Sequence, residues 1–174
     1  FNGDVMTQVN LADVLRLHRE RGAKATIVLT PVENPSDYGL VETDPDGNVK
    51  RFLEKPGPGE ITCDTINAGI YVLEPETFDR IPKDVASSIE RSFFPSLVER
   101  KETFVAYVYH GYWTDIGTPE KYRQVHRDIM DRRFLAEPFG SETRGAQVLG
   151  PGVRIEEGAS VEGPCYVGDE TVLK

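Results

Sequence analysis

The sequence predicts an α/β fold followed by a short repeat region. Over residues 1–134, apolar segments typical of strands alternate with amphipathic segments of helical period. Residues 135–147 have the composition of a linker. From residue 148 to residue 174, apolar residues recur every six positions, a period that fits neither a helix nor a simple strand. We therefore expect a domain, a linker and a repeat region with these boundaries.

The elements of the first region follow from periodicity and capping residues. Asn10 is expected to cap a helix that Gly22 ends, and Pro31 to stop the strand after it. Asp46-Gly47 marks the turn of a hairpin over residues 40–55. The later elements are a strand at 67–74, a short helix at 75–82, a helical segment at 87–101, a strand at 104–110 and a helix at 118–134.

The six-residue period predicts a three-sided solenoid. Its apolar positions are Leu149, Ile155, Val161, Val167 and Leu173, with small residues between them. Each coil needs about 18 residues, so roughly one and a half coils are present, too few to be stable alone. We interpret residues 148–174 as the incomplete start of a left-handed β-helix.

Composition and the ends of the chain narrow the possible partners and location. A net charge of −9 argues against nucleic acid, although a few lysines and a metal suffice to bind one nucleotide. The chain has no signal peptide and no apolar stretch of about 18 residues, and its two cysteines lie far apart, so we expect a cytoplasmic protein without a membrane partner. Because the chain opens on a turn at Asn2-Gly3-Asp4 and ends without a cap, we expect a fragment with material missing at both ends.

Two aspartates are candidate metal ligands. Asp4 follows a turn at the expected end of a strand, where ligand sites of α/β sheets gather. Asp115 lies between a strand and a helix that Thr118 already caps. Together they could bind one Mg²⁺, which favours one or two carboxylates with phosphate oxygens and water. The alternative for both is an ordinary turn or capping aspartate.

Other candidates lie where strands begin or end. Lys55 follows Glu54 and precedes a proline, a placement that suits a phosphate contact or, alternatively, a solvated ion pair. Tyr38-Gly39 and the segment Asn67–Gly69 leave room for close approach of a ligand, or are simply turns.

The segments "NGD", "DYG", "EKP", "NAG" and "WTDIGT", in this order and followed by six-residue repeats, resemble the sugar-nucleotide pyrophosphorylases. These nucleotidyltransferases join a sugar 1-phosphate to a nucleoside triphosphate on a Rossmann-like domain. The resemblance covers residues 2–118, and "SSIERSFFPSL" is most similar to the mannose-1-phosphate guanylyltransferase branch. It implies that this chain holds part of the nucleotidyltransferase domain.

The resemblance also implies a role for each matching residue. Asp4 and Asp115 match the aspartates that hold the catalytic Mg²⁺, and Lys55 matches a catalytic lysine that contacts the sugar phosphate. The substrate-binding candidates are Tyr38, Gly39, Glu54, Asn67, Gly69 and Trp113. Among them, Glu54 matches a carboxylate that binds sugar hydroxyls, and Trp113 is expected to form a wall of the site.

The expected function of the full-length protein is therefore GDP-mannose synthesis. The alternatives are a thymidylyl-, uridylyl- or adenylyltransferase acting on glucose 1-phosphate, a non-catalytic regulatory homologue, and a glycosyltransferase, which fits the repeats poorly. The Gly-rich triphosphate loop of the family is absent from these 174 residues, so the chain alone is expected to be inactive. Exposed β-helix edges and an incomplete sheet favour a homo-oligomer.

Overall fold

A computed structural model describes residues 1–174 apart from 36–37, 55–58, 60 and 137–146. The chain divides into two compact units, which we call the N-terminal unit (Phe1–Trp113) and the C-terminal unit (Thr114–Lys174). Most of the predicted linker lies outside the described residues.

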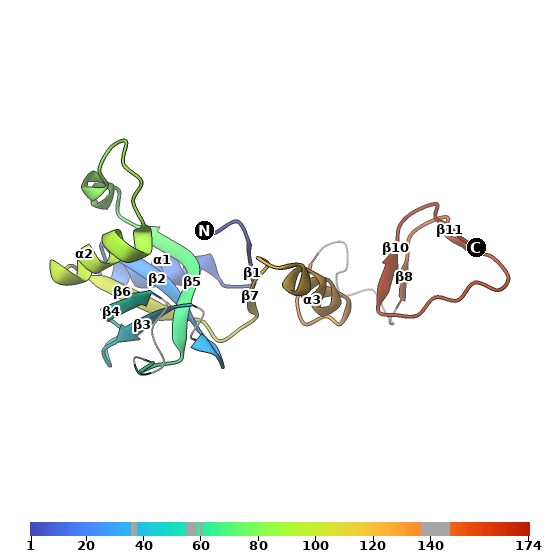
Figure 1. The fold of residues 1–174 in the computed structure, drawn as a ribbon, viewed down its shortest axis with the longest axis horizontal. Coiled ribbons are helices and arrows are strands. Elements are labelled where there is room, and N and C mark those ends of the chain that lie inside the picture. Colours follow the sequence, from blue (N-terminus) through green and yellow to red (C-terminus); the bar gives the residue numbers. More distant parts are fainter. Residues whose placement is uncertain (36–37, 55–58, 60, 137–146) are drawn as a thin grey trace. The chain divides into compact units, whose positions relative to one another are not determined.

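The N-terminal unit holds the strands and helices expected of an α/β domain (Figure 1). In chain order they are β1 (Val5–Thr7), α1 (Leu11–Glu20), β2 (Ala25–Pro31), β3 (Gly39–Thr43), β4 (Val49–Glu54), β5 (Thr65–Leu73), the short helices η2 (Pro75–Arg80) and η3 (Ile89–Phe93), α2 (Phe94–Glu99), β6 (Phe104–Val108) and β7 (Trp113–Asp115), whose last two residues belong to the C-terminal unit.

Five of these strands form one mixed sheet in the order β4-β3-β5-β2-β6. β2 pairs in parallel with β6 and antiparallel with β5, while β3 and β4 form the predicted antiparallel hairpin. The sheet confirms the α/β class, and its mixed pairing agrees with the nucleotidyltransferase-like domain expected from the sequence.

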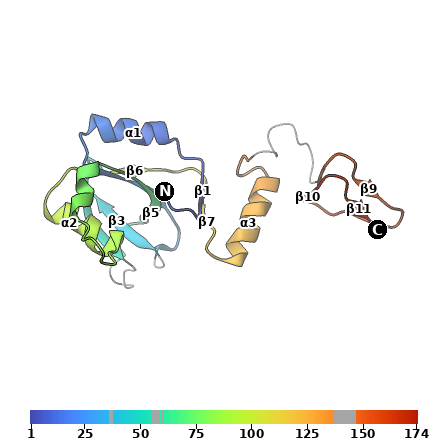
Figure 2. The same cartoon turned by 90° about the horizontal axis from the view of Figure 1, so that it is seen from above.

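Strand β2 buries both of its faces, which explains its apolar sequence "ATIVLT". Ile27 and its neighbours at alternate positions pack against Phe94 of α2, whereas Val28 packs against Val14 of α1. The helices α1 and α2 therefore cover opposite faces of the sheet (Figure 2). β2 lies at the centre of this three-layer arrangement, and β5 pairs directly with it.

Local signals in the sequence placed the helix start and the hairpin turn correctly. The Asn10 side chain accepts a hydrogen bond from the Ala12 amide, and Gly22, just after α1, has a φ of +53°. In the hairpin, Gly47 has a φ of +79°, a conformation that favours glycine. The Asp44 carboxylate holds this turn by accepting bonds from the Asn48 side chain and amide.

The C-terminal unit begins with helix α3 (Pro119–Met130), capped by Thr118 as expected. Four short strands follow: β8 (Gln147–Leu149), β9 (Arg154–Ile155), β10 (Cys165–Val167) and β11 (Val172–Leu173). β10 pairs in parallel with β8 and β11 in parallel with β9, and both registers join residues 18 positions apart, as in Cys165 with Gln147 and Val172 with Arg154. One turn of a three-sided solenoid with six-residue faces requires this spacing; the left-handed β-helix itself stays a prediction.

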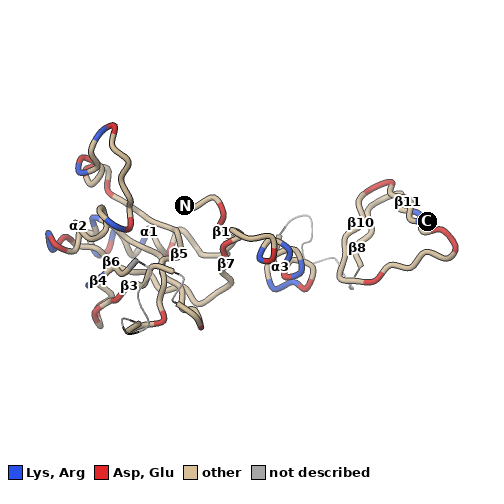
Figure 3. The backbone as a smooth tube through the Cα atoms, viewed as in Figure 1, with Lys and Arg blue, Asp and Glu red and all other residues tan. Residues whose placement is uncertain are grey.

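The distribution of charged residues and the lengths of the helices concern possible nucleic-acid and membrane partners. Lys and Arg are interspersed with Asp and Glu along both units (Figure 3). Among the described residues, no helix has the length and apolar character needed to cross a membrane.

We predict that Phe94→Ala lowers the free energy of unfolding by about 3–5 kcal/mol, because it leaves a cavity in the core. Phe94 is fully buried, and its ring lies 5.1 Å from that of Tyr71 and 5.3 Å from that of Phe104, measured between centroids. Urea unfolding of the intact protein measures the change. Phe78→Ala is the matched control, since Phe78 is 49% exposed and should cost less than about 1.5 kcal/mol. Equal costs for the two variants would contradict this view of the core.

We predict that the contribution of Asp44 to stability disappears at acid pH. Hydrogen bonds from the Asn48 side chain and amide lower the pKa of Asp44 from 3.8 to about 2. Because the folded-state pKa is depressed, the stabilisation is complete above about pH 4 and is lost as the pH falls towards 2. The difference in urea midpoint between wild type and Asp44→Ala should therefore shrink over this window. Asp46→Ala, in the same turn, is the control, and a difference for Asp44→Ala that stays constant down to pH 2 would refute the assignment.

Candidate functional site

The segment Asn67-Ala68-Gly69 forms an irregularity inside strand β5. Leu29 of β2 pairs with Asn67 and Ile27 pairs with Tyr71, so β5 carries extra residues between these two pairs. Gly69 has a φ of +74°. The expectation that the strand begins at Asn67 is corrected here: β5 begins at Thr65, and the polar and small residues produce a bulge within it, because glycine permits the backbone to depart from the regular ladder.

The Asn67 side chain holds the bulge and extends its contacts to a helix. Its Oδ1 accepts a hydrogen bond from the Gly69 amide at 3.0 Å. Its Nδ2 donates to the Tyr71 hydroxyl at 2.8 Å and to Glu90 Oε1 at 2.6 Å. Burial raises the pKa of Tyr71 to about 12, so this hydroxyl stays protonated at neutral pH. Asn67 thus presents a fixed amide beside a carboxylate of η3.

The opening turn of the chain lies against this bulge. The Asn2 amide donates a 2.8 Å hydrogen bond to the Gly69 carbonyl. A Cβ added at Gly69 would lie 2.7 Å from Asn2 Nδ2 and 3.1 Å from Asn2 Cβ, so a side chain at that position would force Asn2 to shift. Asp4 follows Asn2 by two residues and is exposed.

Trp113 contacts the same segment and is itself packed against Tyr38. Trp113 Nε1 donates to the Ala68 carbonyl at 2.9 Å, and the Trp113 ring packs against the cluster that contains Ala68 and Ile70. The Tyr38 ring meets Trp113 edge to face, with centroids 5.9 Å apart. Asn2 and Trp113, far apart in the sequence, thus both contact the β5 bulge, and Tyr38 packs against Trp113.

The hairpin candidates are placed by strand register alone. Gly39 begins β3 and pairs with Glu54 at the end of β4, so these two residues are adjacent in the backbone. Lys55 lies outside the described residues. Its predicted contact with a sugar phosphate, and that of Glu54 with sugar hydroxyls, therefore stay predictions.

Asp115 belongs to the C-terminal unit, whereas Asp4 belongs to the N-terminal unit. The Asp115 side chain is half-buried, and its Oδ1 forms an ion pair with Lys121 Nζ from the first turn of α3. Among the described residues, no three His, Cys, Asp or Glu side chains gather as a complete metal site. A shared metal at Asp4 and Asp115 stays a prediction.

Sequence reasoning missed two contacts of these candidates. Glu90 was part of an expected helix, but no local signal connected it to Asn67, 23 positions earlier. Lys121 carried a signal that was overlooked, because a lysine is unfavourable in the first turn of a helix.

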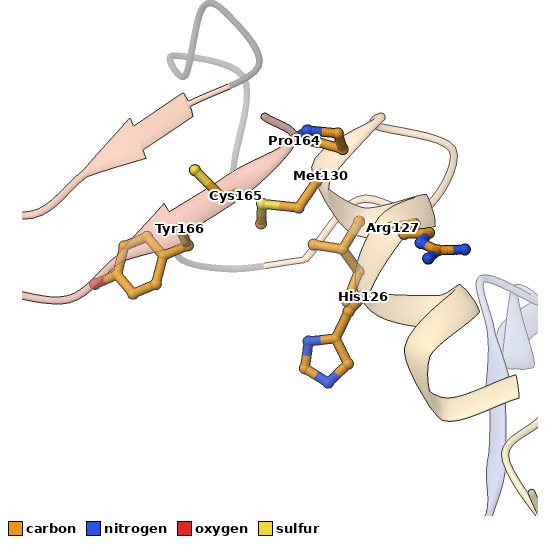
Figure 4. A pocket seen from close by; sticks show the side chains of 7 residues that line it. His126, Arg127, Met130, Pro164, Cys165 and Tyr166 are labelled. Atoms are coloured by element: carbon orange, nitrogen blue, oxygen red, sulfur yellow. The ribbon is translucent and has the colours of Figure 1, made fainter. Parts of the chain in front are cut away.

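The C-terminal unit also contains a cavity of about 390 Å³ between α3 and β10. Met130 and His126 lie on one side of it, with Cys165 and Tyr166 on the other (Figure 4). None of the predicted site residues lines this cavity.

We predict that Gly69→Ala destabilises the protein by more than about 2 kcal/mol, because the new Cβ adds a clash with Asn2 to the strain of a positive φ. Gly22→Ala is the matched control: its φ is also positive, but a Cβ there meets open space, so only about 1 kcal/mol is expected. Urea unfolding measures both. Asn2→Gly in the Gly69→Ala background should recover part of the loss, and equal costs for the two alanine variants would rule out the clash.

The chain is similar in sequence to proteins of a known family. The nucleotidyl transferase family model matches residues 1–132. A mannose-1-phosphate guanylyltransferase of Mycobacterium tuberculosis is 37% identical over 169 residues, which are 97% of this chain and 46% of that protein. A UTP–glucose-1-phosphate uridylyltransferase of Synechocystis is 36% identical over 176 residues, covering 99% of this chain and 45% of that protein.

The fold has a solved counterpart as well. The crystal structure of HddC from Yersinia pseudotuberculosis superposes with a TM-score of 0.58 at 28% identity, covering 71% of this chain and 51% of that one. The chain spans about half the length of the curated relatives described above. From the extent of the family match and the similarity to these relatives, we conclude that the chain belongs to the nucleotidyl transferase family.

Proposed function

We propose that the protein carrying this chain is a sugar-1-phosphate nucleotidyltransferase, with mannose 1-phosphate and GTP as the first choice of substrates. The observation that supports this best is that Asn2 and Trp113 contact the β5 bulge at Gly69 and Ala68, with Tyr38 packed against Trp113. These residues belong to the "NGD", "WTDIGT", "NAG" and "DYG" motifs. These are the segments on which the resemblance to sugar-nucleotide pyrophosphorylases rests. A protein that used this domain only as a scaffold would not need these motifs in contact with one another.

The reaction requires positioning and charge neutralisation more than a protein nucleophile. A phosphate oxygen of the sugar 1-phosphate attacks the α-phosphorus of the nucleoside triphosphate in line. The bond from that phosphorus to the bridging oxygen of the β-phosphate breaks, and pyrophosphate leaves. In this proposal Lys55 neutralises the sugar phosphate, while Tyr38, Gly39 and Trp113 shape the pocket for the sugar.

The donor chemistry of the two aspartates suits Mg²⁺. Asp4 lies in the opening turn and Asp115 ends β7, and both are carboxylates. One or two carboxylates with phosphate oxygens are the ligands that Mg²⁺ prefers in proteins. Bound there, Mg²⁺ would supply neutralisation of charge on the phosphoryl oxygens. In this proposal Asp4 and Asp115 are the residues that would hold the cation.

The hydrogen bonds of Asn67 and Glu90 favour a hydroxyl-rich ligand at the bulge. Glu90 offers carboxylate oxygens that accept from hydroxyl groups, and Asn67 keeps Glu90 Oε1 in place. Glu54 would accept from further hydroxyls. Because relatives named for mannose and for glucose match this chain equally well, the sugar and the base need a direct assay.

We predict that Asp115→Asn lowers kcat/KM of the intact protein for NDP-sugar formation by about 10²-fold, because a neutral amide cannot balance cation charge. Turnover is measured with Mg²⁺ for each pairing of mannose or glucose 1-phosphate with GTP, UTP, dTTP or ATP. Asp131→Asn, at the other end of α3, is the control and should retain activity. Wild-type turnover in Asp115→Asn would remove the metal assignment, and no turnover of any pair by the wild type would favour a non-catalytic homologue.

The repeat region is the second part of the proposal and concerns the β-helix and the oligomeric state. Parallel pairs of strands 18 residues apart support the start of a left-handed β-helix in residues 148–174. Leu149 and Ile155, two of the periodic apolar residues, are exposed. Such side chains are normally covered by the next coil or by another subunit, in keeping with the expected homo-oligomer.

A further inference from the structure

Lys121 occupies a position that local helix energetics disfavour. Thr118 caps α3 by accepting a hydrogen bond from the Lys121 amide at 3.2 Å, which places Lys121 in the first turn. The amides of a helix N-terminus carry partial positive charge, so acidic residues are preferred there and a lysine ammonium is destabilising. An interaction outside the helix must therefore account for the direction of this side chain.

That interaction is the ion pair with Asp115, which lies three residues before the cap. The Lys121 ammonium contacts Oδ1 of the carboxylate, and the two side chains are 36% and 29% exposed. Ion pairs at this degree of exposure contribute only about 0–1 kcal/mol to stability. Folding energy is thus a weak explanation for the pair, whereas its effect on the charge and orientation of the Asp115 carboxylate is direct.

We propose that Lys121 is an internal counter-ion for Asp115 that a divalent cation displaces. This inference rests on the proposed role of Asp115 as a cation ligand. Lys121 neutralises and orients the carboxylate while the cation site is empty. It is a positioning residue, because it acts through Asp115 and not on the substrate.

Charge and side-chain geometry explain why the two cations exclude each other. An ammonium and a divalent cation on the same carboxylate oxygen would repel at ion-pair distance. The lysine must therefore leave for the divalent cation to bind at Oδ1. Lys121 can do so at low cost, because its four-carbon stem is flexible and its ammonium is partly exposed to water.

Displacement of Lys121 by the cation and simple support of Asp115 by Lys121 predict opposite changes in cation affinity when Lys121 is removed. If Lys121 competes with the cation, its removal strengthens cation binding by the energy of the pair, about two- to fivefold in affinity. If Lys121 only supports the carboxylate, its removal weakens cation binding. The sign of the change decides between the two roles.

The test is binding of Mn²⁺ to the intact protein without nucleotide or sugar phosphate, measured from the electron paramagnetic resonance signal of free Mn²⁺. Lys121→Met is expected to bind Mn²⁺ about two- to fivefold more tightly than the wild type. Arg123→Met is the matched control, because it removes a positive charge from the same helix and Arg123 pairs with Glu120 instead. Its affinity for Mn²⁺ should equal that of the wild type, and circular dichroism verifies that both variants fold.

The outcomes separate this inference from the function on which it rests. Unchanged or weaker Mn²⁺ binding by Lys121→Met would overturn the exchange, as would equal tightening by Arg123→Met. Asp115→Asn is expected to abolish the site. If Asp115→Asn instead binds Mn²⁺ as the wild type does, Asp115 is not a cation ligand. The proposed displacement of Lys121 is then wrong as well. Loss of binding in Asp115→Asn without tightening in Lys121→Met would reject the exchange alone.

Discussion

The positive φ of Gly69 is the constraint on which the arrangement of the candidate site depends. This conformation lets β5 depart from regular pairing with β2, and the absence of a side chain lets Asn2 approach the Gly69 carbonyl. The same departure turns the Ala68 carbonyl to the Trp113 indole. The opening turn and the tryptophan would have no shared partner on a regular strand.

A rigid scaffold makes this irregularity tolerable. Strand β2 is buried on both faces by α1 and α2, and it holds β5 on either side of the bulge. Within the bulge, Asn67 satisfies the Gly69 amide that the ladder leaves without a regular partner. This side-chain hydrogen bond therefore offsets the cost of the irregular strand. The bulge also fixes the side-chain amide of Asn67, which holds the carboxylate of Glu90.

Much of the fold was predictable because its signals are local. Asn10 and Thr118 cap helices through bonds that span two or three residues, and Asp46-Gly47 marks its turn by backbone preference. The bulge was missed because hydrophobic periodicity does not distinguish an irregular strand from a turn before a strand. The Glu90 partner of Asn67 was missed because a side-chain hydrogen bond across 23 positions leaves no periodic trace in a sequence.

The sequence by itself determined the family, the helix ends, the hairpin and the six-residue repeat. Each of these depends on residue type at short spacing, which the chain displays without folding. The tertiary structure alone decided that Asn2 contacts Gly69, that Trp113 contacts Ala68 and Tyr38, and that Lys121 forms an ion pair with Asp115. Those contacts depend on packing and on side-chain direction, and neither is defined until the sheet and its helices are in place.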